Sequence, residues 1–203
     1  MKKFILFLVC VVLIVTFAGS MGVITEFSQK KKDMIRLHVV GASNSEADQA
    51  VKLLVRDAVI DCVAEELNGC GCADEAKAYL EESLSAIQLA AEKVLRENGF
   101  QSRVEVSFCE EAFPVRQYDT FALPSGVYRA LRIRIGEAEG KNWWCVVFPS
   151  FCYGASAEGF RDAAVGAGFS EPVTDTLSGK EGYKVSFFLL DLIGRVENFF
   201  HLG

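Results

Sequence analysis

Histidine and cysteine are the side chains in this sequence whose chemistry could support catalysis. The chain holds two histidines, His38 and His201, and seven cysteines. A thiolate beside an imidazole is the minimal nucleophile for acyl transfer, so Cys145 or Cys109 with His38 could form a cysteine hydrolase. For His38 on a strand, however, we favour the interpretation of a structural histidine. The chain has no Gly-x-Ser-x-Gly elbow, no His-Glu-x-x-His and no Gly-rich phosphate loop. We therefore expect a non-enzyme, with an exported cysteine hydrolase or thiol enzyme acting at the cell wall as the alternative.

A metal site is the second chemistry that cysteines could provide. Cys70-Gly71-Cys72 places two thiols close together, but structural zinc needs four soft ligands and only Cys62 is near in sequence. A local disulfide between Cys62 and Cys70 or Cys72 is another use, and free thiols are a third. We expect no metal and no cofactor.

The segment from Asn142 to Cys152 is the densest apolar and aromatic stretch outside the N-terminus. A strand from Trp143 to Phe148 would be apolar on both sides, which predicts cover on both faces. Pro149-Ser150 is a turn pair, so the chain should reverse there and bring Cys152 opposite Cys145, within reach of a disulfide. Two buried free cysteines fit the same spacing.

The N-terminus decides the compartment. Lys2 and Lys3 precede an apolar run from Phe4 to Phe17, and Ala18-Gly19-Ser20 follows, which is typical of an export signal. Cleavage after Ser20 is one outcome. An uncleaved anchor is the other, because no charge appears until Glu26 and such a stretch can span a bilayer.

Both outcomes place the chain beyond about residue 25 outside the cytoplasmic membrane. The protein is then secreted, or it is membrane-anchored and faces outward. That compartment permits disulfides and favours the pairing of Cys145 with Cys152. The net charge of −6 argues against a nucleic-acid partner.

The elements behind these residues predict an α+β fold. Alternation predicts four strands, at Met34–Val40, Arg103–Cys109, Val127–Ile135 and Trp143–Phe148. Capping-box patterns at Ser43 or Ser45 start a helix that ends near Gly69, and a second helix runs from Asp74 to Asn98. We expect an antiparallel sheet with both long helices on one face. The polar connection Glu137 to Lys141 predicts that the last two strands are antiparallel neighbours.

Five segments follow from composition: a signal peptide or anchor (1–25), a polar linker (26–33), the α+β domain (34–153), a Gly/Ala/Ser-rich connector (154–182) and a C-terminal amphipathic helix (183–203). We expect at most one short helix in the connector, near Phe160 to Val165. The C-terminal helix carries one narrow polar stripe, which includes Lys184, Asp191 and Asn198. It could be a core helix packed on the sheet, or lie on a membrane or a membrane-embedded partner.

Three blocks of this sequence match a family pattern: Ile35 to Gln49 followed by Lys52, Val55, Arg56, Asp57 and Ala58; Pro124 to Tyr128; and Asn142 to Pro149 ending in Cys152. Together they resemble the stage II sporulation protein R family of spore-forming bacteria. The resemblance covers about residues 30 to 153, with an export signal in front, and the Asn-Trp-Trp-Cys block is quite specific. The family's usual Ala-Asn-Ser-Asp appears here as Gly41-Ala42-Ser43-Asn44-Ser45.

This resemblance implies a signalling protein without enzymatic activity. It would be exported from the forespore into the space facing the mother cell, where it activates a membrane-embedded aspartic protease, stage II sporulation protein GA, that cleaves the pro-form of sigma-E. The residues that we expect to bind this partner lie in the matching blocks. They are Arg36, His38, Asn44, Ser45, Asp48, Lys52, Arg56, Asp57, Asn142, Trp143 and Trp144.

Overall fold

The computed structural model describes residues 2–151 and 157–202. They fall into two compact units, which are described separately. The sheet unit consists of residues 32–111 and 128–154, and the helical unit consists of residues 1–31, 112–127 and 155–203. The five sequence segments proposed above stay predictions.

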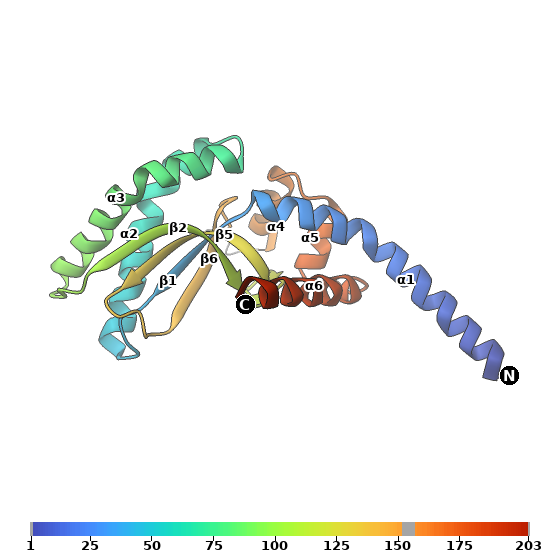
Figure 1. Ribbon diagram of the computed structural model, residues 1–203. Helices are drawn as coiled ribbons and strands as arrows, with labels where there is room; N and C mark the ends of the chain where they lie inside the picture. Colours follow the sequence, from blue (N-terminus) through green and yellow to red (C-terminus); the bar gives the residue numbers. More distant parts are fainter. Residues whose placement is uncertain (1, 152–156, 203) are drawn as a thin grey trace. The chain divides into compact units, whose positions relative to one another are not determined.

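A four-stranded sheet is the frame of the sheet unit (Figure 1). Its strand order is β2-β5-β1-β6. The strands are β1 (Ile35–Val40), β2 (Val104–Phe113), β5 (Gly126–Ile135) and β6 (Asn142–Phe148). The α+β class with four main strands and two long helices is confirmed.

The pairing of the last two strands differs from the prediction. β1 lies between β5 and β6, so Leu37 is opposite Leu131 on one side and Cys145 on the other. β1 is parallel to β5 and antiparallel to β6, which makes the sheet mixed. The connection after β5 is long enough to pass over the end of β1, where the Gly140 N–H donates to the Gly41 carbonyl at 2.9 Å. The hairpin interpretation of β5 and β6 was therefore wrong.

The two long helices, α2 (Glu46–Gly69) and α3 (Ala73–Glu97), cover one face of the sheet, as predicted. Ser45 caps α2. Its hydroxyl oxygen accepts a hydrogen bond from the Asp48 N–H at 3.1 Å, a backbone group that has no acceptor within the first turn of the helix. The shared core holds apolar residues of β1, β5 and both helices. Its fully buried members include Ile35, Leu37, Val39, Val55, Val59, Leu80, Ile87, Ala91, Leu131 and Ile133.

All six residues of β1 are buried, as expected for a strand between two others. On the face away from α2 and α3, this burial includes Arg36, which is 0% exposed, and His38. β6 behaves differently because it is an edge strand. Cys145, Val146 and Val147 are buried, but Trp143 and Trp144 remain partly exposed, so the prediction of full cover holds only for the middle of β6.

The helical unit begins with α1 (Lys2–Lys30), followed by the short 3-10 helix η1 (Lys31–Asp33). Among the described residues, α1 is the one helix long and apolar enough, by length and composition, to cross a membrane. The segment predicted as a polar linker is helical here. Its side chains are engaged: Glu26 accepts hydrogen bonds from Ser170, and Lys31 pairs with Glu197.

The connector also contains more structure than predicted, with two helices, α4 (Ala157–Gly166) and α5 (Glu171–Leu177), in place of at most one. The physical reason is that Phe160, Val173 and Leu177 are buried. Burial of these three apolar side chains stabilises the two helices, although the segment is rich in Gly, Ala and Ser. A short pair of strands, β3 (Arg116–Gln117) and β4 (Ala122–Leu123), and the final helix α6 (Lys184–Leu202) complete the unit.

Candidate partner-binding surface

The eleven predicted partner-binding residues belong to the sheet unit, where they form three groups. The first group surrounds the loop after β1, the second joins α2 to β6, and the third lies on the sheet face opposite α2 and α3. The groups are Asn44, Ser45, Asp48 and Lys52; Arg56, Asp57 and Trp143; and Arg36, His38, Asn142 and Trp144.

The first group holds two loops together. The Asn44 side-chain oxygen accepts the Lys141 N–H at 2.9 Å, which ties the loop after β1 to the loop before β6. Ser43 donates to the Asp48 carboxylate, and Ser45 caps α2. These polar side chains satisfy backbone and side-chain groups within the chain. We therefore assign them to positioning the loop.

Lys52 is the buried member of this first group, with 4% of its surface exposed. Its ammonium donates to the Gln49 side-chain oxygen at 2.7 Å and to the Lys141 carbonyl at 2.9 Å. Burial lowers the pKa of Lys52, and the positive charges of Lys141 and Arg56 lower it further. Because its ammonium is bound to two acceptors within the chain, Lys52 stabilises the two loops and is not available to a partner.

The second group presents side chains at the surface. The Arg56 guanidinium lies over the Trp143 ring, 4.8 Å from its centroid. Asp57 pairs with the same guanidinium at 2.7 Å. Stacking on the indole fixes a side chain that otherwise samples many rotamers. The result is a pre-ordered surface of an aromatic ring, a cation and a carboxylate. Of these, tryptophan and arginine are residue types that are enriched where proteins bind one another.

The third group is centred on His38. The His38 Nδ1 lies 3.0 Å from the Glu111 carboxylate, and Nε2 lies 2.8 Å from the Asn142 side-chain oxygen. The Trp144 ring stacks on the imidazole with a centroid separation of 5.4 Å. Both ring nitrogens thus have partners, which supports the interpretation of His38 as a structural histidine. Through this contact, His38 fixes the orientation of Trp144 at the sheet edge.

Arg36 lies on the same sheet face, and its guanidinium carbon is 5.0 Å from the centroid of the Tyr128 ring. Because Arg36 has no exposed surface, it cannot contact a partner directly. Of the predicted set, the residues that remain accessible at one end of β6 are Asn142, Trp143, Trp144, Arg56 and Asp57. We call these five residues the tryptophan corner.

Three residues that the sequence did not single out help to build this surface. Glu111 orients His38, Arg132 lies 4.0 Å from the same carboxylate, and Gly140 allows the two loops to meet. Glu111 was missed because the predicted strand ended at Cys109, whereas β2 runs to Phe113. Continuing the alternation by one step would have placed Glu111 on the face of Cys109.

The geometry does not support a cysteine nucleophile paired with His38. Cys145 is opposite Leu37 and His38 is opposite Trp144, so the two side chains lie on opposite faces of the sheet. Cys145 is also disulfide-bonded. The predicted partner Cys152 lies outside the described residues, and this pairing stays a prediction.

The remaining described cysteines are free, so the local disulfide that we considered for Cys62 does not form. Burial raises the pKa of Cys109, opposed by Arg132 and reinforced by Glu111, which is the reverse of what a nucleophilic thiol needs. No group of three or more potential metal ligands occurs in the described part of the chain.

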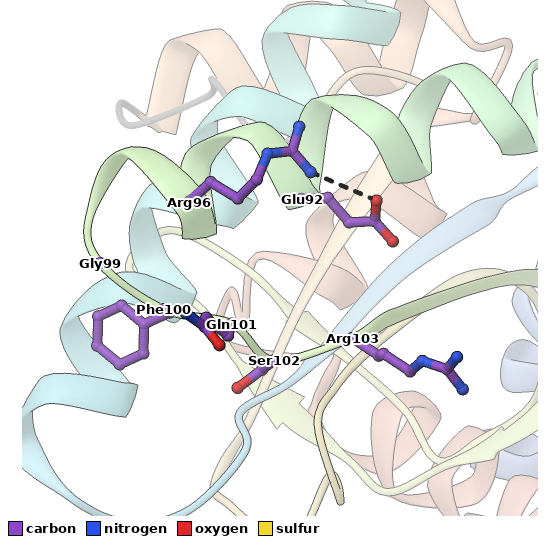
Figure 2. Close-up of a pocket in the computed structure, with 7 residues that line it drawn as sticks. All are labelled: Glu92, Arg96, Gly99, Phe100, Gln101, Ser102 and Arg103. Carbon is purple, nitrogen blue, oxygen red and sulfur yellow. Dashed lines mark ion pairs between the residues drawn. The ribbon is translucent and has the colours of Figure 1, made fainter.

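A pocket of about 530 Å³ opens where α3 leads into β2 (Figure 2). Its lining comes from the end of α3 and the following segment, and includes Arg96, Phe100 and Arg103. Arg96 pairs with Glu92 across a distance of 3.7 Å. None of the predicted site residues lines this pocket, and it does not hold a pair of catalytic groups.

Fold and surface together define an α+β protein that carries an apolar N-terminal helix and an aromatic corner at a sheet edge. The family model described as Stage II sporulation protein R matches residues 31–158. The chain therefore belongs to the stage II sporulation protein R family. The Stage II sporulation protein R of Bacillus subtilis (strain 168) is 26% identical over 221 residues, which cover 95% of this chain and 98% of that protein. No solved structure matches the chain.

Proposed function

We propose that this protein is an exported signal of sporulation that activates a membrane-embedded aspartic protease of the stage II sporulation protein GA type. The activated protease then cleaves the pro-form of sigma-E. The observation that carries this proposal is the family match over residues 31–158, which contains all of the tryptophan corner. In this proposal the protein acts by binding its partner and not by catalysis.

Two features of the chain support this proposal. Helix α1 begins with two lysines that precede its apolar run, as an export signal or an outward-facing anchor would. The tryptophan corner offers a pre-ordered aromatic and charged surface outside the cell, where a protease with an external domain could bind it. The contact would involve Trp143, Trp144 and Arg56 directly, while His38 and Lys52 act by holding these side chains and loops in place.

Co-expression in a non-sporulating host tests the proposal. The full chain is produced together with the candidate protease and a pro-sigma-E substrate, and cleavage is followed by immunoblot. We expect cleavage to require all three components and an active-site aspartate in the protease. Absence of cleavage when the exported protein and the protease are both present in the membrane fraction would argue against the proposal.

A matched pair of variants separates binding from export. Trp144→Ala should reduce cleavage while leaving the amount of exported protein unchanged. Leu89→Ala alters an exposed apolar residue on α3, 62% exposed, and should leave cleavage at the wild-type level. Equal activity of the two variants would place the contact away from the tryptophan corner.

A further inference from the structure

In the last helix of the helical unit, α6, polar residues are buried while a stripe of large apolar residues is exposed. Ser186 and Asp191 are 6% and 8% exposed, whereas Phe188, Phe199 and Phe200 are 63%, 76% and 76% exposed. The other exposed apolar residues of α6 continue the same stripe along the helix; they are Val185, Leu192, Ile193 and Val196. A helix in water has the opposite arrangement, so water is not the expected neighbour of this stripe.

Specific contacts fix this orientation of α6. The Asp191 carboxylate accepts the Ser125 N–H at 2.9 Å, and the Asn198 amide donates to the Phe113 carbonyl at 2.8 Å. Gly194 makes the closest approach, because a Cβ there would lie 1.6 Å from the Ser125 carbonyl oxygen. Rotating α6 to bury its apolar side would break these hydrogen bonds and cause a backbone clash. The exposed stripe is therefore set by the fold.

Helix α1 runs beside α6 in the same direction. The Ser20 and Ser186 hydroxyls are 3.0 Å apart, and Lys31 pairs with Glu197. Lys31 is the residue directly after α1. Because Ser20 and Lys31 are eleven residues apart, as are Ser186 and Glu197, the two helices align in parallel over about 17 Å. The first turns of α6 thus lie level with the part of α1 that begins near Ser20.

The length of the exposed part of α1 indicates the depth at which α6 begins in a bilayer. The described side chains from Phe4 to Phe17 are exposed all around the helix, and this stretch is about 20 Å long. A hydrocarbon core is about 30 Å thick. The remaining third of the hydrocarbon thickness must be crossed by the part of α1 after Phe17. In that part, Ser20, Val23 and Ile24 are buried. That is the level at which α6 begins.

The charges of α6 fit the same location. Both of its acidic residues, Asp191 and Glu197, make contacts on the protein side. The exposed charges that border the apolar stripe are Lys184 and Arg195, both basic. Long basic side chains at the edge of the hydrocarbon can extend their charged groups to the anionic headgroups of a bilayer.

We infer that the first turns of α6 are seated in the outer leaflet of the membrane that α1 spans, with Val185 and Phe188 among the acyl chains. The anchor is then a pair of parallel helices joined by Ser20 and Ser186. Two helices restrict rotation about the membrane normal, so they fix the direction in which the helical unit faces. This inference concerns the retained form of α1 and does not depend on the proposed activation of a protease.

Photo-crosslinking identifies what covers Phe188. The full-length chain is produced with p-benzoylphenylalanine in place of Phe188 and reconstituted into vesicles of phosphatidylethanolamine and phosphatidylglycerol. After irradiation, adducts are identified by mass spectrometry. We expect phospholipid adducts at Phe188, more abundant than at the control position Leu89 on α3 by on the order of tenfold.

Two outcomes would overturn the inference. Adducts between two copies of the chain would show that the stripe is a self-association surface, and adduct yields at Phe188 no higher than at Leu89 would show that the stripe lies outside the bilayer. A second probe at Val185 repeats the measurement on the same stripe, and near-UV circular dichroism verifies that each labelled protein is folded. Failure of protease activation would leave these lipid adducts unchanged, so the two proposals are tested separately.

Discussion

The guanidinium carbon of Arg56 on α2 lies 4.8 Å from the centroid of the Trp143 ring on β6. This contact joins the edge strand to the helix that covers the sheet, and Asp57 holds the guanidinium from the other side. Trp143 is thereby kept in one orientation while part of its surface remains accessible. The contact explains how an edge strand can present an aromatic side chain without losing order.

Replacing Arg56 by alanine should separate stability from activation. We expect the free energy of unfolding to fall by only about 0.5–1 kcal/mol, the range for an exposed cation–π contact. Protease activation in the co-expression assay should fall more strongly, because the cation is removed from the contact surface and Trp143 loses the contact that orients its ring. Arg96→Ala on α3 is the control, since Arg96 forms a surface ion pair with Glu92. If the two variants activate equally, Arg56 does not contribute to binding.

His38 provides a second prediction, this time about stability. His38→Ala leaves the Glu111 carboxylate and the Asn142 amide without their ring partner, so we expect a loss of about 1–3 kcal/mol in the free energy of unfolding. Chemical denaturation of the detergent-solubilised chain measures this loss. The matched control is the other histidine, since His201→Ala changes an exposed residue of α6 and should shift stability by less than about 0.5 kcal/mol. Equal effects would show that the His38 contacts are not stabilising.

Local signals in the sequence located the elements of the sheet unit well. The Ser45 cap and the stop near Gly69 each predicted a helix boundary that the structure contains, and the predicted helix from Asp74 to Asn98 corresponds to α3. Such signals depend on neighbours within one helical turn. The lateral order of strands depends on contacts far apart in the chain, and the polar loop before β6 fitted a hairpin as well as it fits a passage over β1.

The candidate surface was predicted as a set of residues but not as an arrangement. Residue types alone do not distinguish Lys52, whose ammonium is bound inside the loops, from Arg56, which reaches the surface. The orientation of α6 was also beyond the sequence. The polar stripe could be seen in the sequence. That Asp191 and Asn198 face the protein depends on the backbone groups of Ser125 and Phe113, with which they form hydrogen bonds.

Gly140 gives a prediction about the contact between the two loops. A Cβ at this position would lie 2.3 Å from the Ser43 carbonyl oxygen and 2.7 Å from the Gly41 carbonyl oxygen. Because both are backbone atoms, the loops must move apart, and we expect Gly140→Ala to cost about 1–3 kcal/mol. Thermal unfolding measures the change. Gly69→Ala, where nothing lies within 4 Å, should be nearly neutral, and an equally neutral Gly140→Ala would contradict the close approach.

Asp175 should make the stability of the helical unit depend on pH. A hydrogen bond from Lys180, together with one from Arg161, lowers the pKa of Asp175 despite its burial. A carboxyl group with a lowered pKa in the folded state stabilises the fold above its unfolded pKa of about 4, and this contribution is lost as pH falls through the folded pKa. Asp175→Asn should therefore be less stable at pH 6 and lose less stability between pH 6 and 3. Melting curves compare it with Asp162→Asn, an exposed carboxylate, which should follow the wild type.

The predicted disulfide between Cys145 and Cys152 can be tested without any partner protein. Peptide mapping of the exported chain under non-reducing conditions should recover these two cysteines in one linked species, while Cys62 and Cys109 should react with an alkylating agent because they are free. Closing a loop of this length restricts the unfolded chain, so reduction should lower the free energy of unfolding by about 2–3 kcal/mol. Cys62→Ser is the control and should leave both results unchanged. Alkylation of Cys145 in the exported, unreduced protein would refute the pairing. The disulfide would then no longer support the proposal that the protein is exported to an oxidising compartment.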